Sequence, residues 1–194
     1  MGTGSEKRER LIRAAREVVY RQGYAPTTLA QIAQAASVPL GNVYYYFKTK
    51  DAIAEAVIDA RLAEVRATLE RAERHERPED RLAGLLELLL EGCGDVARRG
   101  CPYGSLVHEM ERRPGPLGAR AALLLELQRR WMETQFQAIG LGRRARGLAL
   151  ELLCATQGAA LVTHALGDPN LMRERFRGLQ SWIRGLARRA GPGP

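Results

Sequence analysis

Side chains that build catalytic and metal sites are scarce in this sequence. Its 194 residues include three cysteines and three histidines. The cysteines form no CxxC pair and the histidines form no HxxxH or HExxH pair. There is also no Gly-x-Ser-x-Gly motif, phosphate loop or dinucleotide fingerprint. We therefore expect a protein that is not an enzyme and that uses no metal or cofactor. In one alternative, Cys101, His108 and Glu109 form a metal or catalytic cluster, but a single loop supplies few ligands.

Segments that direct a chain to or through a membrane are also missing. Residues 1–10 lack the apolar core of a signal peptide. The longest aliphatic run, in residues 85–90, is interrupted by Glu87 and followed by Glu91, so we expect no membrane-spanning helix and no membrane partner. An odd number of scattered thiols suits a reducing compartment. The expected location is the cytoplasm.

Acidic residues are few at the N-terminal end of the chain. The formal net charge is +8. Residues 1–50 hold 8 Lys or Arg against 3 Glu, whereas the remaining residues hold 22 basic against 19 acidic side chains. Positive charge concentrated in this first part favours a polyanionic partner there, as nucleic acid would be.

Hydrophobic spacing along the chain is that of helices. Apolar residues recur every three or four positions in segments separated by Gly and Pro, and no segment alternates as a strand does. We expect an all-α protein with about nine helices. These helices span roughly residues 5–22, 29–36, 40–47, 50–75, 79–93, 105–112, 117–139, 143–166 and 169–190.

The second and third of these segments predict a helix-turn-helix. The apolar residues of the first short helix share one face: Leu29, Ile32, Ala33 and Ala36. Residues 37–39 interrupt that pattern, and Pro39 is tolerated at the opening of the next helix. In this next helix Leu40, Val43 and Phe47 are spaced to face the core. In a helix-turn-helix the second helix enters the major groove of DNA.

The other side of the second helix carries side chains suited to DNA. Gly41 lets a base edge approach the backbone, and Asn42 can read adenine or hold a phosphate. The tyrosines at 44, 45 and 46 can contact thymine methyls and phosphates. Three successive tyrosines cannot all face one core. Thr27 and Thr28 precede the first helix, where a hydroxyl can cap the helix and its N-terminus can bind phosphate.

These residues resemble the tetracycline-repressor-like (TetR) family of bacterial transcription regulators. The matching features are Gly23-Tyr24, Thr27-Thr28, Ile32-Ala33, Ala36 and the run GNVYYYFKTK over residues 41–50. The resemblance covers roughly residues 6–58, and the rest of the chain matches in length and helical character. Pro39-Leu40 departs from the family pattern, in which many members carry a small polar residue and then a polar or basic one. Leu40 is therefore expected to make an apolar contact.

The resemblance implies a role for each matching position. Four residues lie where the family approaches bases: Leu40, Gly41, Asn42 and Tyr44. Five lie where it holds phosphates: Thr27, Thr28, Tyr45, Tyr46 and Lys50. It also implies a helix-turn-helix domain over residues 1–49 and a ligand-binding and dimerisation domain over residues 50–194. The implied function is that of a homodimeric repressor released from double-stranded operator DNA by a small-molecule effector. Activation is the alternative to repression.

The last two long helices are the expected homodimer interface, because the corresponding helices of the family form a four-helix bundle across the two-fold axis. Small residues at 155 and 158–160 allow close helix approach. Trp182 lies off the apolar stripe of its helix, which suits an interface aromatic. In the alternative, both helices complete the core of the monomer.

The middle helices are expected to enclose a pocket for a small, largely apolar molecule. Aromatic, methionine and a few polar side chains are typical of such a pocket, and equally of a core. The candidate lining residues are Leu62, Leu89, Cys93, Tyr103, Leu106, Val107, Met110, Trp131, Met132, Phe136 and Gln157.

Cys101 is a possible redox sensor. It lies at a Gly/Pro break near Arg98 and His108, where its thiol could react with electrophiles or oxidants. The alternative is an inert thiol in a turn.

Two other classes of protein are a DNA-binding architectural protein and a helical interaction module. The first has no need of a large apolar domain, and the second has no need of the basic first part.

Overall fold

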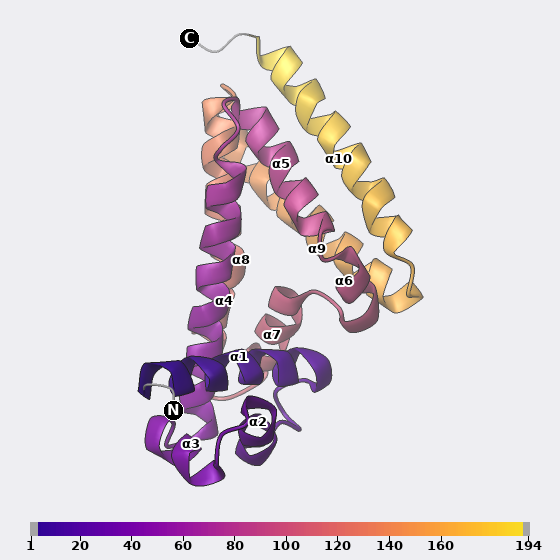
Figure 1. Ribbon diagram of the computed structural model, residues 1–194. Helices are drawn as coiled ribbons and strands as arrows, with labels where there is room; N and C mark the ends of the chain where they lie inside the picture. The colour runs from indigo at the N-terminus through magenta and orange to yellow at the C-terminus, as the bar shows by residue number, and fades with distance from the viewer. Residues whose placement is uncertain (1–3, 192–194) are drawn as a thin grey trace. The chain divides into compact units, whose positions relative to one another are not determined.

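A computed structural model describes residues 4–191 of the protein. Within that part of the chain, ten α-helices and one 3₁₀ turn follow one another without a β-strand, so the expected all-α class is confirmed (Figure 1). The helices are α1 (Gly4–Gln22), α2 (Leu29–Ala36), α3 (Leu40–Tyr46), α4 (Lys50–Ala72), α5 (Pro78–Leu90), α6 (Cys93–Arg99), α7 (Pro102–Glu111), α8 (Leu117–Ala138), α9 (Ala145–Leu166) and α10 (Pro169–Ala190), with the turn η1 (Gly142–Arg144) before α9.

The fifth expected helix ends earlier than expected, and an additional short helix follows it. The helix expected over residues 79–93 ends as α5 at Leu90, and α6 begins at Cys93, after Glu91 and Gly92. The apolar spacing continues across the division, so periodicity alone does not predict it. Gly92 has φ −95° and ψ 7°, outside the helical region, and serves as the N-cap of α6. Glycine is a weak helix former, which makes this position the natural point of interruption.

The chain divides into two compact units. One unit comprises the described residues up to Ala63 together with Ser105–Leu124, and the other comprises Glu64–Gly104 and the described residues from Leu125 onward. Helices α4, α7 and α8 each contribute one end to each unit. The functional boundary expected between residues 49 and 50 remains a prediction, because compactness does not assign function.

In the first unit, the three N-terminal helices and the start of α4 contribute to one apolar core. Helix α1 packs on α2, and α2 packs on α3. The residues that form this core are fully or almost fully buried: Leu11, Ala15, Val18, Ile32, Ala33, Val43, Phe47, Ile53 and Val57. At about 1.5–3 kcal/mol for each large apolar side chain, this burial supplies most of the stabilisation that positions α3.

In the second unit, α10 packs against both α5 and α9, and α6 packs against α9 (Figure 1). Helix α10 is strongly amphipathic, with Met172, Phe176, Leu179 and Ile183 buried along one face. Trp182 is half-buried, and the edge of its ring meets Phe136 with centroids 5.9 Å apart. At least part of this side chain therefore serves the core of its own unit.

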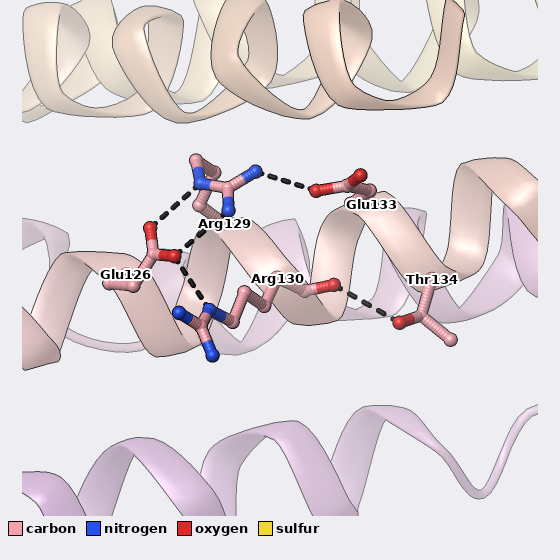
Figure 2. Close-up of polar contacts among 5 residues, drawn as sticks. All are labelled: Glu126, Arg129, Arg130, Glu133 and Thr134. Carbon is pink, nitrogen blue, oxygen red and sulfur yellow. Dashed lines mark hydrogen bonds and ion pairs between the residues drawn. The ribbon is translucent and has the colours of Figure 1, made fainter. Parts of the chain in front are cut away.

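Helix α8 carries an ion-pair network on its surface. Arg129 donates two hydrogen bonds to Glu126 and one to Glu133, and Arg130 donates a further bond to Glu126 (Figure 2). The spacings of three and four residues place these side chains on adjacent turns. The hydrogen bonds from Arg129 and Arg130 lower the pKa of Glu126 from 4.5 to about 2. The carboxylate is therefore ionised throughout the neutral and mildly acidic range.

Candidate nucleic-acid interface

The N-terminus of α2 is closed by a capping box. Thr28 has an extended backbone, and its hydroxyl accepts a hydrogen bond from the N–H of Gln31 at 3.2 Å. The Gln31 side chain accepts in turn from the N–H of Thr28 at 2.8 Å. This reciprocal pair satisfies two of the helix's free donors and orients the first turn. Thr28 is exposed there, so it remains a candidate phosphate contact.

Thr27 has a different position from the one expected. Its side chain is 2% exposed, and its hydroxyl donates to the carbonyl of Gly23 at 2.6 Å. In the free protein this hydroxyl is buried and engaged, and it closes the turn between α1 and α2. The expected phosphate contact of Thr27 remains a prediction.

The turn between α2 and α3 is held from α1. Ser37 has φ 52° and ψ 48°, the left-handed conformation in which many helices end. The guanidinium of Arg10 donates to the carbonyl oxygens of Ala36 and Ser37 at 3.1 and 2.9 Å. A cation at this position donates hydrogen bonds to the carbonyl groups at the C-terminus of α2 and neutralises the partial negative charge of that helix end. Sequence reasoning missed Arg10, because its partners lie 26 and 27 residues away.

Helix α3 has a buried side and an exposed side. Val43 is fully buried and Phe47 nearly so, as the spacing predicts. Leu40 is 41% exposed, so its expected place in the core is wrong, and it lies instead with the exposed side chains of Tyr44 and Tyr45. Tyr45 is the most exposed of them at 76%. The exposed side of α3 thus presents two aromatic rings and one aliphatic side chain.

Gly41 lies within this exposed side. Apart from the adjacent residues and the backbone of α3 itself, no atom of the described residues lies within 4 Å of the position that a Cβ would take at this residue. The helical backbone also allows any L-residue there. Nothing in the fold therefore requires a glycine, and the absence of a side chain leaves the backbone of α3 open to an approaching surface.

The remaining predicted DNA contacts are less exposed. Asn42 and Tyr46 are half-buried, and the rings of Tyr45 and Tyr46 meet edge to face at 5.0 Å. The Lys50 ammonium donates to the carbonyl of Ala25 at 2.9 Å and lies 4.3 Å from the centre of the Tyr24 ring. Burial lowers the pKa of Lys50. Lys50 therefore already has a partner within the protein, and two of its three N–H donors remain for a phosphate.

The predicted ligand-lining residues fall in both compact units. Leu62, Leu106, Val107 and Met110 belong to the first unit, and the other seven belong to the second. Six of the eleven are buried, and the others are half-buried: Leu89, Tyr103, Val107, Trp131 and Gln157. The indole N–H of Trp131 donates to Glu73 at 2.8 Å. Their role in binding a ligand remains a prediction.

Two hollows bear on this prediction. In the first unit, a space of about 10 Å³ beside Tyr24 and Leu106 is too small for an organic ligand. In the second unit, an open groove of about 610 Å³ runs between α9 and α10, lined by Ala155, Gly158, Ala159, Val162, Leu171, Glu174, Arg175 and Gly178. None of the predicted ligand-lining residues lines this groove.

The cysteines are free thiols. Cys93 is buried, Cys101 is half-buried and Cys154 is exposed. The sulfur of Cys101 accepts a weak hydrogen bond from the N–H of Gly104 at 3.4 Å, and Arg98 is paired with Asp95 at 2.7 Å. Across residues 4–191, no group of three or more His, Cys, Asp or Glu side chains is arranged to hold a metal ion. The redox role of Cys101 remains a prediction.

Comparison with known proteins finds the same helix-turn-helix. The family model described as "Bacterial regulatory proteins, tetR family" matches residues 11–57. The transcriptional regulator TtgR of Pseudomonas putida is 38% identical over 86 residues, which are 44% of this chain and 40% of that protein. An uncharacterised transcriptional regulator of Lactococcus lactis is 28% identical over 182 residues, which are 87% of this chain and 89% of that protein.

Solved structures share the fold over most of the chain. The regulatory protein TetR from Rhodobacter sphaeroides superposes with a TM-score of 0.79 at 26% identity, covering 89% of this chain and 96% of that one. A TetR-family transcriptional regulator from Streptomyces coelicolor superposes with a TM-score of 0.83 at 21% identity, covering 96% of each chain. The fold is therefore shared over most of the chain, while the family model matches residues 11–57 alone.

Proposed function

The chain belongs to the tetR family of bacterial regulatory proteins and is a DNA-binding transcriptional regulator, and on that basis we propose that it is a homodimeric repressor released from its operator by a small, largely apolar molecule. The observation that carries the DNA-reading part is the two-sided character of α3. Leu40, Tyr44 and Tyr45 are exposed on a helix whose opposite side is buried. Large apolar side chains gathered on the exposed side of one helix favour an external partner.

The exposed side of α3 enters the major groove in this proposal. Leu40, Gly41, Asn42 and Tyr44 face the bases, where backbone proximity, amide hydrogen bonds and apolar contacts read sequence. Phosphates flank this region and are held by Thr28, Tyr45, Tyr46 and Lys50, which position the helix without reading sequence. The capping box of α2 and the Arg10 contacts keep these groups in a fixed arrangement.

The homodimer forms through α9 and α10. Leu150, Leu161, Val162 and Leu166 of α9 are exposed, with Leu161 at 67% and Leu166 at 68%. Val162 also lines the groove between α9 and α10, together with the small residues Ala155, Gly158, Ala159 and Gly178, which allow a second pair of helices to approach closely. A two-fold dimer would place two reading helices about 34 Å apart, one turn of the duplex.

A membrane is the alternative explanation for this apolar surface. By length and composition alone, the segment Gly142–Leu166 could cross a membrane. However, 44% of its most apolar window is buried within the protein. Partial burial of this kind is expected of a helix that completes a bundle core, so we assign the exposed remainder to a second copy of the chain. The proposed place of action is the bacterial cytoplasm, where the operator is.

The effector binds among the middle helices, where the predicted lining residues are mostly apolar. Helix α4 is continuous from Lys50 to Ala72, about 35 Å at 1.5 Å per residue. A ligand that prefers a different spread of the two reading heads would shift the dimer to a form that cannot engage both half-sites. It can do so only to the extent of its different affinities for the two forms.

The test is a titration of DNA followed by fluorescence anisotropy at several salt concentrations. The probe is the sequence enriched by the protein from random duplex DNA, with a scrambled duplex as control. We expect tight binding to the enriched probe that weakens steeply with salt. Tyr45→Ala should weaken it about tenfold, whereas Arg143→Ala, an exposed cation of η1, should leave it unchanged. No enriched sequence, with equal weak binding to all duplexes, would exclude a sequence-reading role.

A further inference from the structure

Tyr24, in the turn between α1 and α2, lies at the centre of a cluster of charged side chains. Tyr24 is 2% exposed, and its hydroxyl donates to Asp51, the second residue of α4, at 2.7 Å. Lys50 lies over its ring at 4.3 Å. Burial and the Asp51 hydrogen bond raise the pKa of Tyr24, so its hydroxyl remains a donor at any physiological pH. The turn is thereby joined to the start of α4.

Two further members of the cluster come from a distant part of the sequence. Glu109, near the end of α7, accepts a hydrogen bond from the backbone N–H of Tyr24 at 2.7 Å. Arg113, in the segment after α7, donates to Asp51 at 3.2 Å and lies over the Tyr24 ring at 4.8 Å. All five residues belong to the same compact unit. The turn is therefore held from α7 as well as from α4.

The backbone at the end of α1 is shaped to admit Glu109. Gly23 has φ +84°, a conformation that L-residues with side chains rarely adopt. A Cβ on Gly23 would lie 2.7 Å from one carboxylate oxygen of Glu109, while the other oxygen accepts the Tyr24 N–H. The carboxylate thus lies directly against the backbone of the turn. Its hydrogen bond is of the stronger, charge-assisted kind.

We propose that Glu109 and Arg113 are positioning residues for DNA binding, which act from α7 and the segment after it by fixing the α1–α2 turn and the start of α4. These residues need not touch DNA. They fix the α1–α2 turn, which leads into the capped N-terminus of α2, and the first turn of α4, which carries Lys50. The DNA-affinity part of this inference rests on the proposed function, whereas the restraint of the turn does not.

The same arrangement supplies a path for regulation. Leu106 and Met110 of α7 are buried, and both are among the predicted ligand-lining residues. Because α7 is a single helix from Pro102 to Glu111, a displacement at Leu106 is carried to Glu109 within one turn. A ligand that moves α7 would therefore loosen the α1–α2 turn directly, besides any change transmitted along α4.

The test compares variants of the full-length protein in two measurements. Glu109→Ala removes the acceptor, and Glu111→Ala, at an exposed position two residues away, makes the same change in charge. Arg113→Ala and Arg112→Ala form a second matched pair. Amide hydrogen exchange measures the protection of the Tyr24 N–H, and anisotropy measures the Kd for the enriched DNA probe. Glu109→Gln, which keeps an acceptor oxygen, is the conservative rescue.

We expect Glu109→Ala to lower the protection of the Tyr24 amide about tenfold and to raise the operator Kd about tenfold. Glu111→Ala should change neither, Glu109→Gln should restore most of both, and exchange in α9 and α10 should stay as in the wild type. Equal exchange at Tyr24 in Glu109→Ala and Glu111→Ala would overturn the inference. So would an equal rise in exchange through α9 and α10, because the effect would then be global unfolding.

Failure of the proposed function has a different signature. If the wild type selects no DNA sequence, the repressor proposal fails, while the exchange measurement still decides whether α7 restrains the turn. If the wild type binds its probe and Glu109→Ala binds it equally well despite a loosened turn, the restraint does not position the reading head and the inference fails.

Discussion

Replacing Gly41 by alanine should show whether this glycine is required for the stability of the fold or for DNA binding. A Cβ at Gly41 would meet no side chain or other element of the described residues within 4 Å, apart from its chain neighbours, and the residue lies in a helix. Alanine is favoured over glycine in helices by up to about 1 kcal/mol. Gly41→Ala should therefore leave the protein as stable as before or more stable, by up to that amount. For a chain of this length the melting temperature would rise by up to about 4 °C.

The effect on DNA binding should have the opposite sign. If a base edge approaches the backbone of α3 at Gly41, the added methyl group holds the whole helix away from the groove. A well-formed base contact is worth about 1–3 kcal/mol. Losing one contact corresponds to a rise in operator Kd of about 5- to 140-fold, at about 1.4 kcal/mol per factor of ten. Binding to scrambled DNA should change much less, because it depends on charge.

Gly94→Ala is the matched control for this variant. Gly94 is the second residue of the seven-residue helix α6, as Gly41 is the second residue of the seven-residue helix α3. A Cβ there would meet only the flexible end of Arg98, at an ordinary contact distance of 3.7 Å. Thermal unfolding and anisotropy titration are measured for both variants. An unchanged operator Kd in Gly41→Ala, with unimpaired stability, would refute a close approach of DNA to α3 at this residue.

Three other outcomes follow from the structure. The lowered pKa of Glu126 means that its ion pairs stabilise the fold fully above about pH 5 and progressively less as the pH falls toward 2. The difference in unfolding free energy between wild type and Glu126→Gln, from urea denaturation, should therefore shrink as the pH falls over that range, and a difference that grew would contradict this pH dependence. Leu161→Glu should convert the dimer to a monomer in analytical ultracentrifugation, whereas Leu123→Glu, at a comparably apolar exposed site on α8, should not; a dimer that survives Leu161→Glu would place the interface elsewhere. Arg10→Ala should cost about 1 kcal/mol of stability through two lost hydrogen bonds, against no change in Arg13→Ala, and equal losses would mean that the bonds contribute nothing specific.

Much of the reading head could be predicted from sequence because its signals are local. The spacing of Ile32, Ala33 and Ala36 places them on one face of a helix whatever surrounds it, and all three are buried. Pro39 ends one segment and opens the next through its own ring geometry. Three successive tyrosines had to diverge around α3, and they do, from half-buried Tyr46 to exposed Tyr45.

The expectations that the structure changed concern positions where two neighbouring residues, or two sides of one helix, are locally equivalent. Thr27 and Thr28 are both able to cap α2, and the carbonyl of Gly23 engages the first and leaves the second at the cap. Leu40 has the right spacing for the core, but the core behind α3 is filled by Val43 and Phe47. The break at Gly92 was invisible because the leucine spacing continues across it.

The sequence alone determined the all-α class, the helix-turn-helix and the exposed aromatic side of α3, because helix periodicity, capping and turn chemistry act between residues within about four positions of one another. Only the tertiary structure decided which groups hold that element in place. Arg10 reaches carbonyls 26 and 27 residues away, and Glu109 reaches the backbone of Tyr24 across 85 residues. No local pattern specifies such pairs, because each depends on the packing of whole helices, which brings a single polar side chain to an unsatisfied backbone group.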